Sequence, residues 1–369
     1  MEPRLSLARK LGYTLFRSST LGSNQRADFI LHVARKEMRM GKQLPPAGIR
    51  VILATLWTPP TKSDPFGKMD LQAIATQARR MYDSGHRVFI STAGSGSGFD
   101  ISIEQVVVAA RVVSEALSDK TDAWIYVGCV AGLAQCLEVA NGVRGLKNVK
   151  GLLILPNRHP HGDPKGDGWL EFYQMLSPAM QLPYMVYHVQ PGITIQQYMQ
   201  LAQDPNFVEL KWALATPEAL DQLRQAVKAL SADVSVVCGL GDKNGPDWIR
   251  EYGVRGWTSY TVNHAPRLCK EIELASLAGD TARVQALQGP VLAFEDQRFG
   301  DNVRFNNRLV VAALQGREAF LRPPNRRYDD AEWRDAAAVI ARLAAAEVET
   351  KARTTASTPE RQAPAGVRN

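Results

Sequence analysis

The chain has few cysteines and no long apolar run. Only four cysteines occur in its 369 residues, and no two of them have the Cys-x-x-Cys spacing that is typical of zinc sites and redox motifs. Their neighbours are apolar, which favours reduced thiols packed in the core of a cytoplasmic protein over disulfides. No stretch of about 18 apolar residues is present, so the sequence predicts no membrane span. The four residues are Cys129, Cys136, Cys238 and Cys269.

Acidic residues are fewer than basic ones, with 37 Asp and Glu against 44 Lys and Arg, which gives a net charge of +7. The basic residues are scattered, with a local excess mainly before residue 45 and after residue 316. They do not interleave with aromatic residues, as they would in a nucleic-acid-binding surface. We therefore expect no nucleic-acid partner.

Acids are nearly absent from residues 1–26, where Glu2 stands alone among several arginines and serines. This composition fits two interpretations, an organellar transit peptide and a bacterial N-terminal arm that helps to pack an oligomer. Because composition alone is a weak indicator of targeting, the arm is the favoured interpretation.

Large apolar side chains are almost missing from residues 350–369, which predicts a disordered tail. The chain is long enough to bury a large core as one domain with extensions. We expect a basic N-terminal arm over residues 1–45, a catalytic barrel over 46–279 and a helical region over 280–349.

Between the two ends, apolar runs typical of buried strands alternate with segments whose apolar residues recur at helical spacing. Strands are predicted at residues 49–56, 88–91, 124–127, 151–155, 184–187, 208–211, 234–238 and 256–259. Helices are predicted at residues 71–84, 103–117 (behind Ser102 as the N-cap), 132–140, 169–180, 195–202, 217–230, 246–252 and 266–277. Eight successive strand–helix units favour an α/β fold of the closed (β/α)8 barrel type over an open, doubly wound sheet.

A lysine and a tyrosine end two neighbouring predicted strands, Lys211 after the run 207–210 and Tyr187 after the run 184–186. Catalytic groups of parallel barrels lie at the carboxyl ends of strands. Burial lowers the pKa of a lysine, so its neutral amine can attack a ketone and form a Schiff base while a nearby phenol moves protons. For a lone lysine, the alternative is an amine that reaches solvent at a strand end.

A loop of alternating glycine and serine follows the second predicted strand and precedes a helix. Backbone amides and hydroxyls in such a loop can hold a carboxylate or phosphate. We expect Gly94, Ser95, Gly96 and Ser97 to bind the anionic end of a substrate. A flexible turn and a dinucleotide-binding loop are the alternatives, although the spacing is not Gly-x-Gly-x-x-Gly.

From about residue 48 to 287, and more loosely to Trp333, the chain resembles the superfamily of dihydrodipicolinate synthases and N-acetylneuraminate lyases. The order and spacing of several short segments carry this resemblance, and Lys211 falls on the Schiff-base lysine of that superfamily. The segments are Thr58-Pro59, Gly94 to Gly98, Leu155-Pro156, Tyr187-His188-Val189, Gly239-Leu240-Gly241-Asp242, residues 256–263 and Arg322-Pro323-Pro324.

The resemblance implies a class I aldolase-type lyase that requires neither a metal nor an organic cofactor. The reaction would be retro-aldol cleavage, aldol condensation, or condensation coupled to loss of water. Lys211 would condense with the carbonyl of pyruvate or a longer 2-oxo acid, and Tyr187 would move protons. Ser95 and the amides of its loop would hold the 2-oxo acid carboxylate, and Thr258 would lie beside it. An aldehyde is the expected second substrate, and the resemblance implies a homo-oligomer, a dimer or a tetramer.

Departures from the superfamily pattern affect the second substrate. Residues 190–193 lack the arginine with which dihydrodipicolinate synthases bind it, so a role in lysine biosynthesis is not expected. Asn157, Arg158 and His159 stand where those enzymes have two tyrosines. These three residues and His188 are candidates for acceptor specificity, because histidine titrates near neutrality and guanidinium binds carboxylates.

Two other functions stay open. A dehydratase of a sugar-derived 2-oxo acid would use the same imine but expel hydroxide, and product analysis would separate it from an aldolase. A barrel that has lost catalysis and binds a ligand is the other alternative. Retention of both Lys211 and Tyr187 argues against the latter, because a buried lysine without a function is costly.

Overall fold

The computed structural model describes residues 42–65, 67–96, 98–130, 132–155, 167–189, 192–300, 308–321 and 326–356. The predictions for the N-terminal arm up to residue 41, and for Ser97, Asn157, Arg158 and His159, lie outside the described residues. The chain divides into two compact units, Met1–Gln43 and Leu44–Asn369, and all that follows concerns the second unit.

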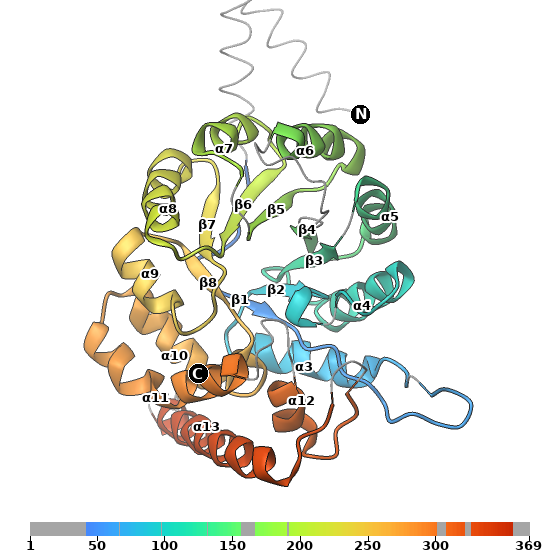
Figure 1. The fold of residues 1–369 in the computed structure, drawn as a ribbon, viewed down its shortest axis with the longest axis vertical. Coiled ribbons are helices and arrows are strands. Elements are labelled where there is room, and N and C mark those ends of the chain that lie inside the picture. Colours follow the sequence, from blue (N-terminus) through green and yellow to red (C-terminus); the bar gives the residue numbers. More distant parts are fainter. Residues whose placement is uncertain are drawn as a thin grey trace, which may run out of the picture. The chain divides into compact units, whose positions relative to one another are not determined.

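Eight parallel strands form a closed barrel in the order β1 to β8 (Figure 1), which confirms the predicted fold class. β1 pairs with β2 on one side and with β8 on the other, where Arg50 lies opposite Thr258. The strands are β1 (Gly48–Ile52), β2 (Val88–Ser91), β3 (Trp124–Val130), β4 (Val149–Leu155), β5 (Tyr184–His188), β6 (Phe207–Trp212), β7 (Ser235–Cys238) and β8 (Gly256–Ser259).

A helix follows each strand and covers the outside of the barrel (Figure 1). The predicted N-cap is confirmed, because the Ser102 hydroxyl accepts a hydrogen bond from the amide of Gln105 at the start of α4. The helices are α3 (Leu71–Asp83), α4 (Ile103–Ala116), α5 (Leu133–Val143), α6 (Asp167–Met180), α7 (Ile195–Leu201), α8 (Pro217–Leu230), α9 (Gly245–Tyr252) and α10 (Pro266–Leu277).

The first strand is shorter than predicted and ends at Ile52, although the next residues are buried. The reason is that the Asn263 side chain, instead of a neighbouring strand, forms hydrogen bonds with the backbone there. Asn263 accepts a hydrogen bond from the amide of Ala54 at 3.2 Å and donates one to the carbonyl of Ile52 at 2.7 Å. The backbone groups are therefore satisfied without a neighbouring strand.

In the described part of the chain, three helices follow the barrel: α11 (Thr281–Gly300), α12 (Arg308–Gln315) and α13 (Asp330–Ala356). α11 contacts both α10 and α13. α13 is longer than predicted, since residues 350–356 are helical rather than part of a disordered tail. Thr350 is buried, and its hydroxyl donates to the carbonyl of Ala346 at 2.8 Å, which extends the packed face of the helix.

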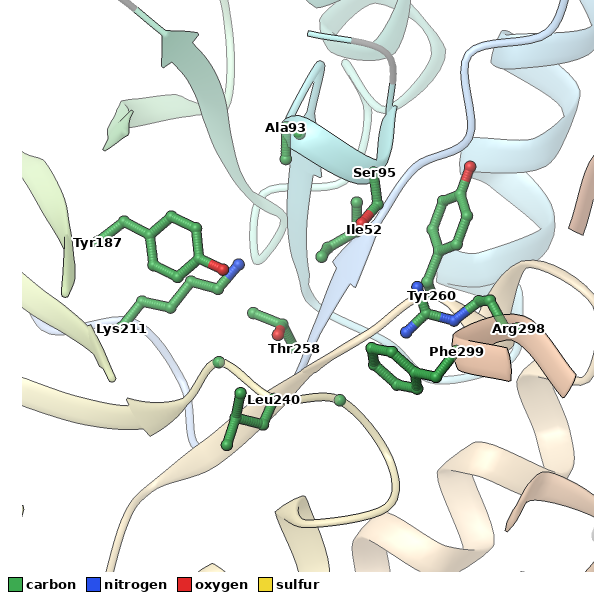
Figure 2. Close-up of a pocket in the computed structure, with 13 residues that line it drawn as sticks. Ile52, Ala93, Ser95, Tyr187, Lys211, Leu240, Thr258, Tyr260, Arg298 and Phe299 are labelled. Atoms are coloured by element: carbon green, nitrogen blue, oxygen red, sulfur yellow. The ribbon is translucent and has the colours of Figure 1, made fainter. Parts of the chain in front are cut away.

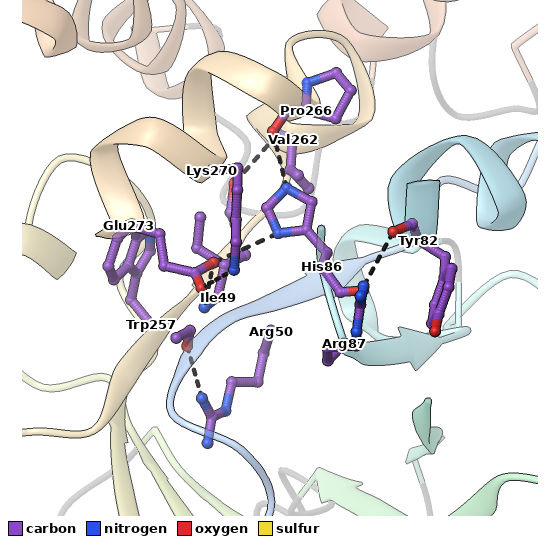
Figure 3. A network of polar contacts seen from close by, with 12 residues as sticks. Ile49, Arg50, Tyr82, His86, Arg87, Trp257, Val262, Pro266, Lys270 and Glu273 are labelled. Carbon is purple, nitrogen blue, oxygen red and sulfur yellow. Dashed lines mark hydrogen bonds and ion pairs between the residues drawn. The ribbon is translucent and has the colours of Figure 1, made fainter. Parts of the chain in front are cut away.

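A buried polar network joins α10 to the start of β1 (Figure 3). Glu273 accepts a hydrogen bond from the amide of Ile49 at 3.1 Å, forms an ion pair with Lys270 and lies 3.5 Å from Nδ1 of His86. Burial raises the pKa of Glu273, but the hydrogen bond with His86 and the charge of Lys270 outweigh it and hold the pKa below its ordinary value.

The barrel interior is partly polar. Arg50 on β1 and Glu209 on β6 are fully buried and form an ion pair, with an Arg50 Nε to Glu209 Oε1 distance of 3.0 Å. Ser235 donates to the same carboxylate oxygen at 2.8 Å. Because side chains alternate along a strand, Lys211 points into the barrel on the same side as Glu209.

Across the described residues, no helix is long and apolar enough to cross a membrane.

Candidate active site

A cavity opens at the carboxyl ends of the strands, as expected for a parallel barrel (Figure 2). Its empty space is about 500 Å³ when the open mouth is included. Most lining residues come from strand ends and the loops that follow them, and two come from α11. They are Ile52, Ala93, Gly94, Ser95, Tyr187, Lys211, Gly239, Leu240, Gly241, Thr258, Tyr260, Arg298 and Phe299.

Lys211 and Tyr187 lie side by side in this cavity. They are register partners on β6 and β5, and their exposed fractions are 4% and 5%. The Nζ atom of Lys211 lies 4.0 Å from the centroid of the Tyr187 ring. Figure 2 shows the amine and the phenol hydroxyl directed toward the same part of the cavity. An amine and a hydroxyl so placed can act on one carbonyl group.

A glycine makes room for the lysine side chain. Gly239 follows β7, and a Cβ atom there would lie 2.9 Å from the Trp212 carbonyl oxygen and 3.0 Å from Cε of Lys211. Both distances are too short for a relaxed side chain. The backbone just after β7 can pass this close to the end of β6 and to the Lys211 side chain because residue 239 is glycine.

The glycine-rich loop forms a short 3-10 turn, η1 (Gly94–Gly96), whose first residues line the cavity. Gly96 has a supporting position instead. Its amide donates to the Ala93 carbonyl at 2.8 Å, and its carbonyl accepts a hydrogen bond from the Thr55 hydroxyl. The turn thus uses the Gly96 amide internally, and a role of Gly96 in substrate binding stays a prediction. Gly94 and Ser95 stay available to a ligand.

Thr258 lines the cavity from β8 and is 2% exposed. Its hydroxyl donates a long hydrogen bond of 3.5 Å to the Cys238 carbonyl. The hydroxyl oxygen can still accept a hydrogen bond from a ligand. Among the sequence-predicted residues that the structure describes, Gly94, Ser95, Tyr187, Lys211 and Thr258 come together in one cavity.

His188 does not belong to this cavity. It follows Tyr187 on β5, so the alternation of side chains turns it outward. Nδ1 of His188 lies 2.8 Å from the Tyr198 hydroxyl, and its ring centroid lies 4.1 Å from that of Trp212. Burial lowers the pKa of His188 to about 4, so it is neutral at pH 7. A role in acceptor specificity is not consistent with this position in the core.

Arg298 and Phe299 were not predicted from the sequence. They lie near the end of α11, beyond the barrel, and line the cavity because α11 packs against α10 and η2 (Thr261–Asn263). One feature of the sequence relates to the approach of α11, namely the glycine at position 241. In the structure Gly241 has a φ of +87°. A Cβ atom there would lie 2.5 Å from Oε2 of Glu295, so this glycine allows α11 to approach.

Two buried carboxylates and one guanidinium connect α11 to the barrel. Glu295 accepts hydrogen bonds from Nε of Arg298 at 2.8 Å and from the Thr261 hydroxyl at 3.0 Å. Asp242 accepts from Nε1 of Trp257 and from the Ser259 hydroxyl, both at 2.8 Å. Burial raises the pKa of Asp242 to about 7, and the charge of Glu295 acts in the same direction.

The fold and the site together define a parallel (β/α)8 barrel with a buried lysine and a tyrosine at the ends of neighbouring strands. Residues 50–339 match the sequence model of the dihydrodipicolinate synthetase family. The chain therefore belongs to the dihydrodipicolinate synthetase family, which confirms the resemblance inferred from its sequence.

Curated relatives share limited identity with the chain. The 4-hydroxy-tetrahydrodipicolinate synthase of Acidiphilium cryptum (strain JF-5) is 29% identical over 170 residues, which cover 44% of this chain and 56% of the relative. That of Aromatoleum aromaticum (strain DSM 19018 / LMG 30748 / EbN1) is 25% identical over 196 residues, or 52% and 64% of the two chains. The chain thus spans less than two thirds of the length of either relative.

Solved structures agree with the fold over nearly their whole length. The dihydrodipicolinate synthase of Oceanobacillus iheyensis has a TM-score of 0.71 at 18% identity, with 83% of this chain and 98% of that chain covered. The enzyme of Bacillus clausii has a TM-score of 0.69 at 20% identity, with 84% and 98% covered. At such identities the likeness shows a shared fold.

Proposed function

We propose that the protein is a class I aldolase-type lyase that forms a Schiff base between Lys211 and pyruvate or a pyruvate-derived 2-oxo acid. The observation that carries this proposal is the Lys211–Tyr187 pair, buried at the carboxyl ends of adjacent strands in one cavity. Membership of the dihydrodipicolinate synthetase family and the names of its relatives support the same chemistry.

The reaction begins when the neutral Lys211 amine attacks the carbonyl carbon of the 2-oxo acid. Tyr187 passes a proton to the carbinolamine oxygen, which leaves as water, and the product is an iminium ion on Lys211. The Tyr187 phenolate left by that step takes a proton from the neighbouring carbon, and the iminium nitrogen accepts the electron pair, which gives an enamine. In the condensing direction the enamine attacks the carbonyl carbon of an aldehyde, and water then releases the product from Lys211.

Ser95 and the backbone at Gly94 hold the carboxylate of the 2-oxo acid in this proposal. Both line the cavity, and the first amides of a 3-10 turn have no acceptor within the turn itself. A fixed carboxylate orients the neighbouring carbonyl toward the amine and lowers the entropic cost of attack. Thr258 lies on the same cavity wall as a further hydroxyl.

Exchange of the pyruvate methyl protons for deuterium tests the proposal, because it requires the iminium and the enamine but no second substrate. We expect the wild type to catalyse the exchange, as followed by proton NMR, and Lys211→Ala to abolish it. Tyr187→Phe slows the exchange by about 100-fold or more, the usual contribution of a proton-transferring group.

Lys228→Ala is the matched control, because Lys228 is an exposed lysine on α8. It exchanges at the wild-type rate if the effect is specific to the cavity. Equal exchange by the wild type and Lys211→Ala would show that Lys211 does not form the imine.

A further inference from the structure

Arg298 places a second basic group in the cavity, and it comes from a helix outside the barrel. Its side chain is 5% exposed and lines the same cavity as Lys211. Figure 2 shows Lys211 and Arg298 entering the cavity from opposite sides, with Tyr260 and Phe299 beside the guanidinium. The Cζ atom of Arg298 lies 4.4 Å from the centroid of the Phe299 ring.

Glu295 holds the guanidinium along one edge. Nε of Arg298 donates to Oε1 at 2.8 Å, and Nη2 donates to Oε2 at 3.2 Å. A guanidinium has five N–H donors, and these two bonds leave the edge formed by Nη1 and Nη2 with donors to spare. Within the part of the chain that the structure describes, Nη1 forms no hydrogen bond. That edge is therefore fixed in position and able to bind a planar anion in a bidentate way.

Arg298 is the cationic side chain that the cavity offers to an anionic group of a ligand. Among the described lining residues, Lys211 and Arg298 are the two basic side chains and none carries a carboxylate, and Lys211 reacts as a neutral amine in the proposed mechanism. The carboxylate next to the reacting carbonyl is already assigned to Gly94 and Ser95. Arg298 is therefore left for a second anionic group, in a chain that lacks the expected arginine at residues 190–193.

We propose that Arg298 binds a carboxylate at the end of the substrate distant from the carbonyl that Lys211 attacks. The substrates are then 2-oxo acids, or their aldol adducts, that carry a second carboxylate. This inference rests on the proposed function, since it takes Lys211 as the group that binds the carbonyl. Arg298 is a specificity-determining residue, and α11 supplies the cation that the β5–α7 loop lacks.

Calorimetric titration with two acids of equal carbon number tests this inference. 2-Oxoglutarate carries the second carboxylate, and 2-oxopentanoate ends in a methyl group. We expect the wild type to bind 2-oxoglutarate at least tenfold more tightly than 2-oxopentanoate. Arg298→Met reduces this ratio of dissociation constants by tenfold or more, and Arg298→Lys, which keeps a charge but loses the planar edge, reduces it less.

Two further variants guard against a loss of folding. Glu295→Gln/Arg298→Met removes both members of the ion pair, so no buried carboxylate is left unpaired, and it has the same effect on the ratio. Arg283→Met makes the same substitution at an exposed arginine of α11 and keeps the wild-type ratio. Thermal unfolding of every variant checks that it is folded.

The outcomes separate the two proposals. An unchanged ratio in Arg298→Met, or an equal loss of affinity for both acids, overturns the inference, and an equal loss would place Arg298 at the carboxylate next to the carbonyl. Deuterium exchange into pyruvate with an unchanged ratio would overturn the inference alone. A changed ratio in a protein without exchange would support the carboxylate site and contradict Schiff-base formation.

Discussion

Lys211 is a buried lysine whose position in the cavity depends on a few individual neighbours. Tyr187 lies opposite it on β5, and Gly239 leaves the space that its side chain occupies. The sequence predicts Lys211 and Tyr187 as site residues because each ends an apolar run typical of a buried strand. Their proximity then follows from the parallel barrel, in which all strand ends of one kind meet at one face.

Other site residues could not be predicted by the same reasoning. Arg298 lies on α11, far along the chain from Lys211, and no local pattern connects the two residues. Its place in the cavity depends on the tertiary packing of α11 against α10 and α13. His188 shows the opposite error, since proximity to a strand end suggested a site role. The alternation of side chains, which turns neighbours to opposite faces, excludes it from the cavity.

Asp242 should make the stability of the protein depend on pH. Its folded-state pKa is raised to about 7, above that of an unfolded aspartate, so the folded state binds the proton more tightly. The free energy of unfolding therefore contains a contribution that is present below about pH 4 and is lost as the pH rises toward 7. Asp242→Asn removes this dependence and keeps an acceptor for Nε1 of Trp257.

We expect Asp242→Asn to gain stability relative to the wild type between pH 4 and pH 8, by on the order of 1–3 kcal/mol. Urea unfolding at both pH values measures the difference. Asp296→Asn, at an exposed carboxyl on α11, is the control and shows little change with pH. A difference between Asp242→Asn and the wild type that is the same at pH 4 and pH 8 would contradict the raised pKa.

At the scale of elements, local sequence patterns predict the strands and helices closely. They predict the ends of an element where a specific residue marks the boundary. Proline at the first turn marks the starts of α8 and α10, which match the prediction. The end of β1 does not, because the Asn263 side chain replaces a strand neighbour there. That replacement depends on residues more than 200 positions apart. No local pattern contains it.

The network between α10 and β1 is a second element-scale feature with a measurable role. Glu273→Gln keeps an acceptor for the Ile49 amide but loses the charge that pairs with Lys270 and His86. Because hydrogen bonds to buried charged groups contribute about 1.5–3 kcal/mol, we expect a loss of that size in the free energy of unfolding.

Urea unfolding of Glu273→Gln at pH 7 measures this loss, with Asp221→Asn as the control. Asp221 pairs with Arg224 on the exposed face of α8, where an ion pair contributes less than about 1 kcal/mol. If Glu273→Gln lost no more stability than Asp221→Asn, the network would not help to hold α10 against the barrel.

At the scale of the whole molecule, the barrel and the helices after it share one site. α11 lies outside the eight strand–helix units, yet it contributes Arg298 and Phe299 to the cavity that contains Lys211. The barrel at residues 46–279 therefore does not form this cavity alone. We propose that the helical region after the barrel is part of the catalytic unit. A homo-oligomer stays a prediction from the family resemblance.

The central claim is that Lys211 forms a Schiff base with a 2-oxo acid in this cavity. The most direct measurement is the mass of the intact protein and of its peptides after incubation with pyruvate and reduction with borohydride. The proposed chemistry predicts one added pyruvyl group, located on Lys211 and absent from Lys211→Ala. No adduct with pyruvate or with 2-oxoglutarate, or an adduct that persists in Lys211→Ala, would contradict it.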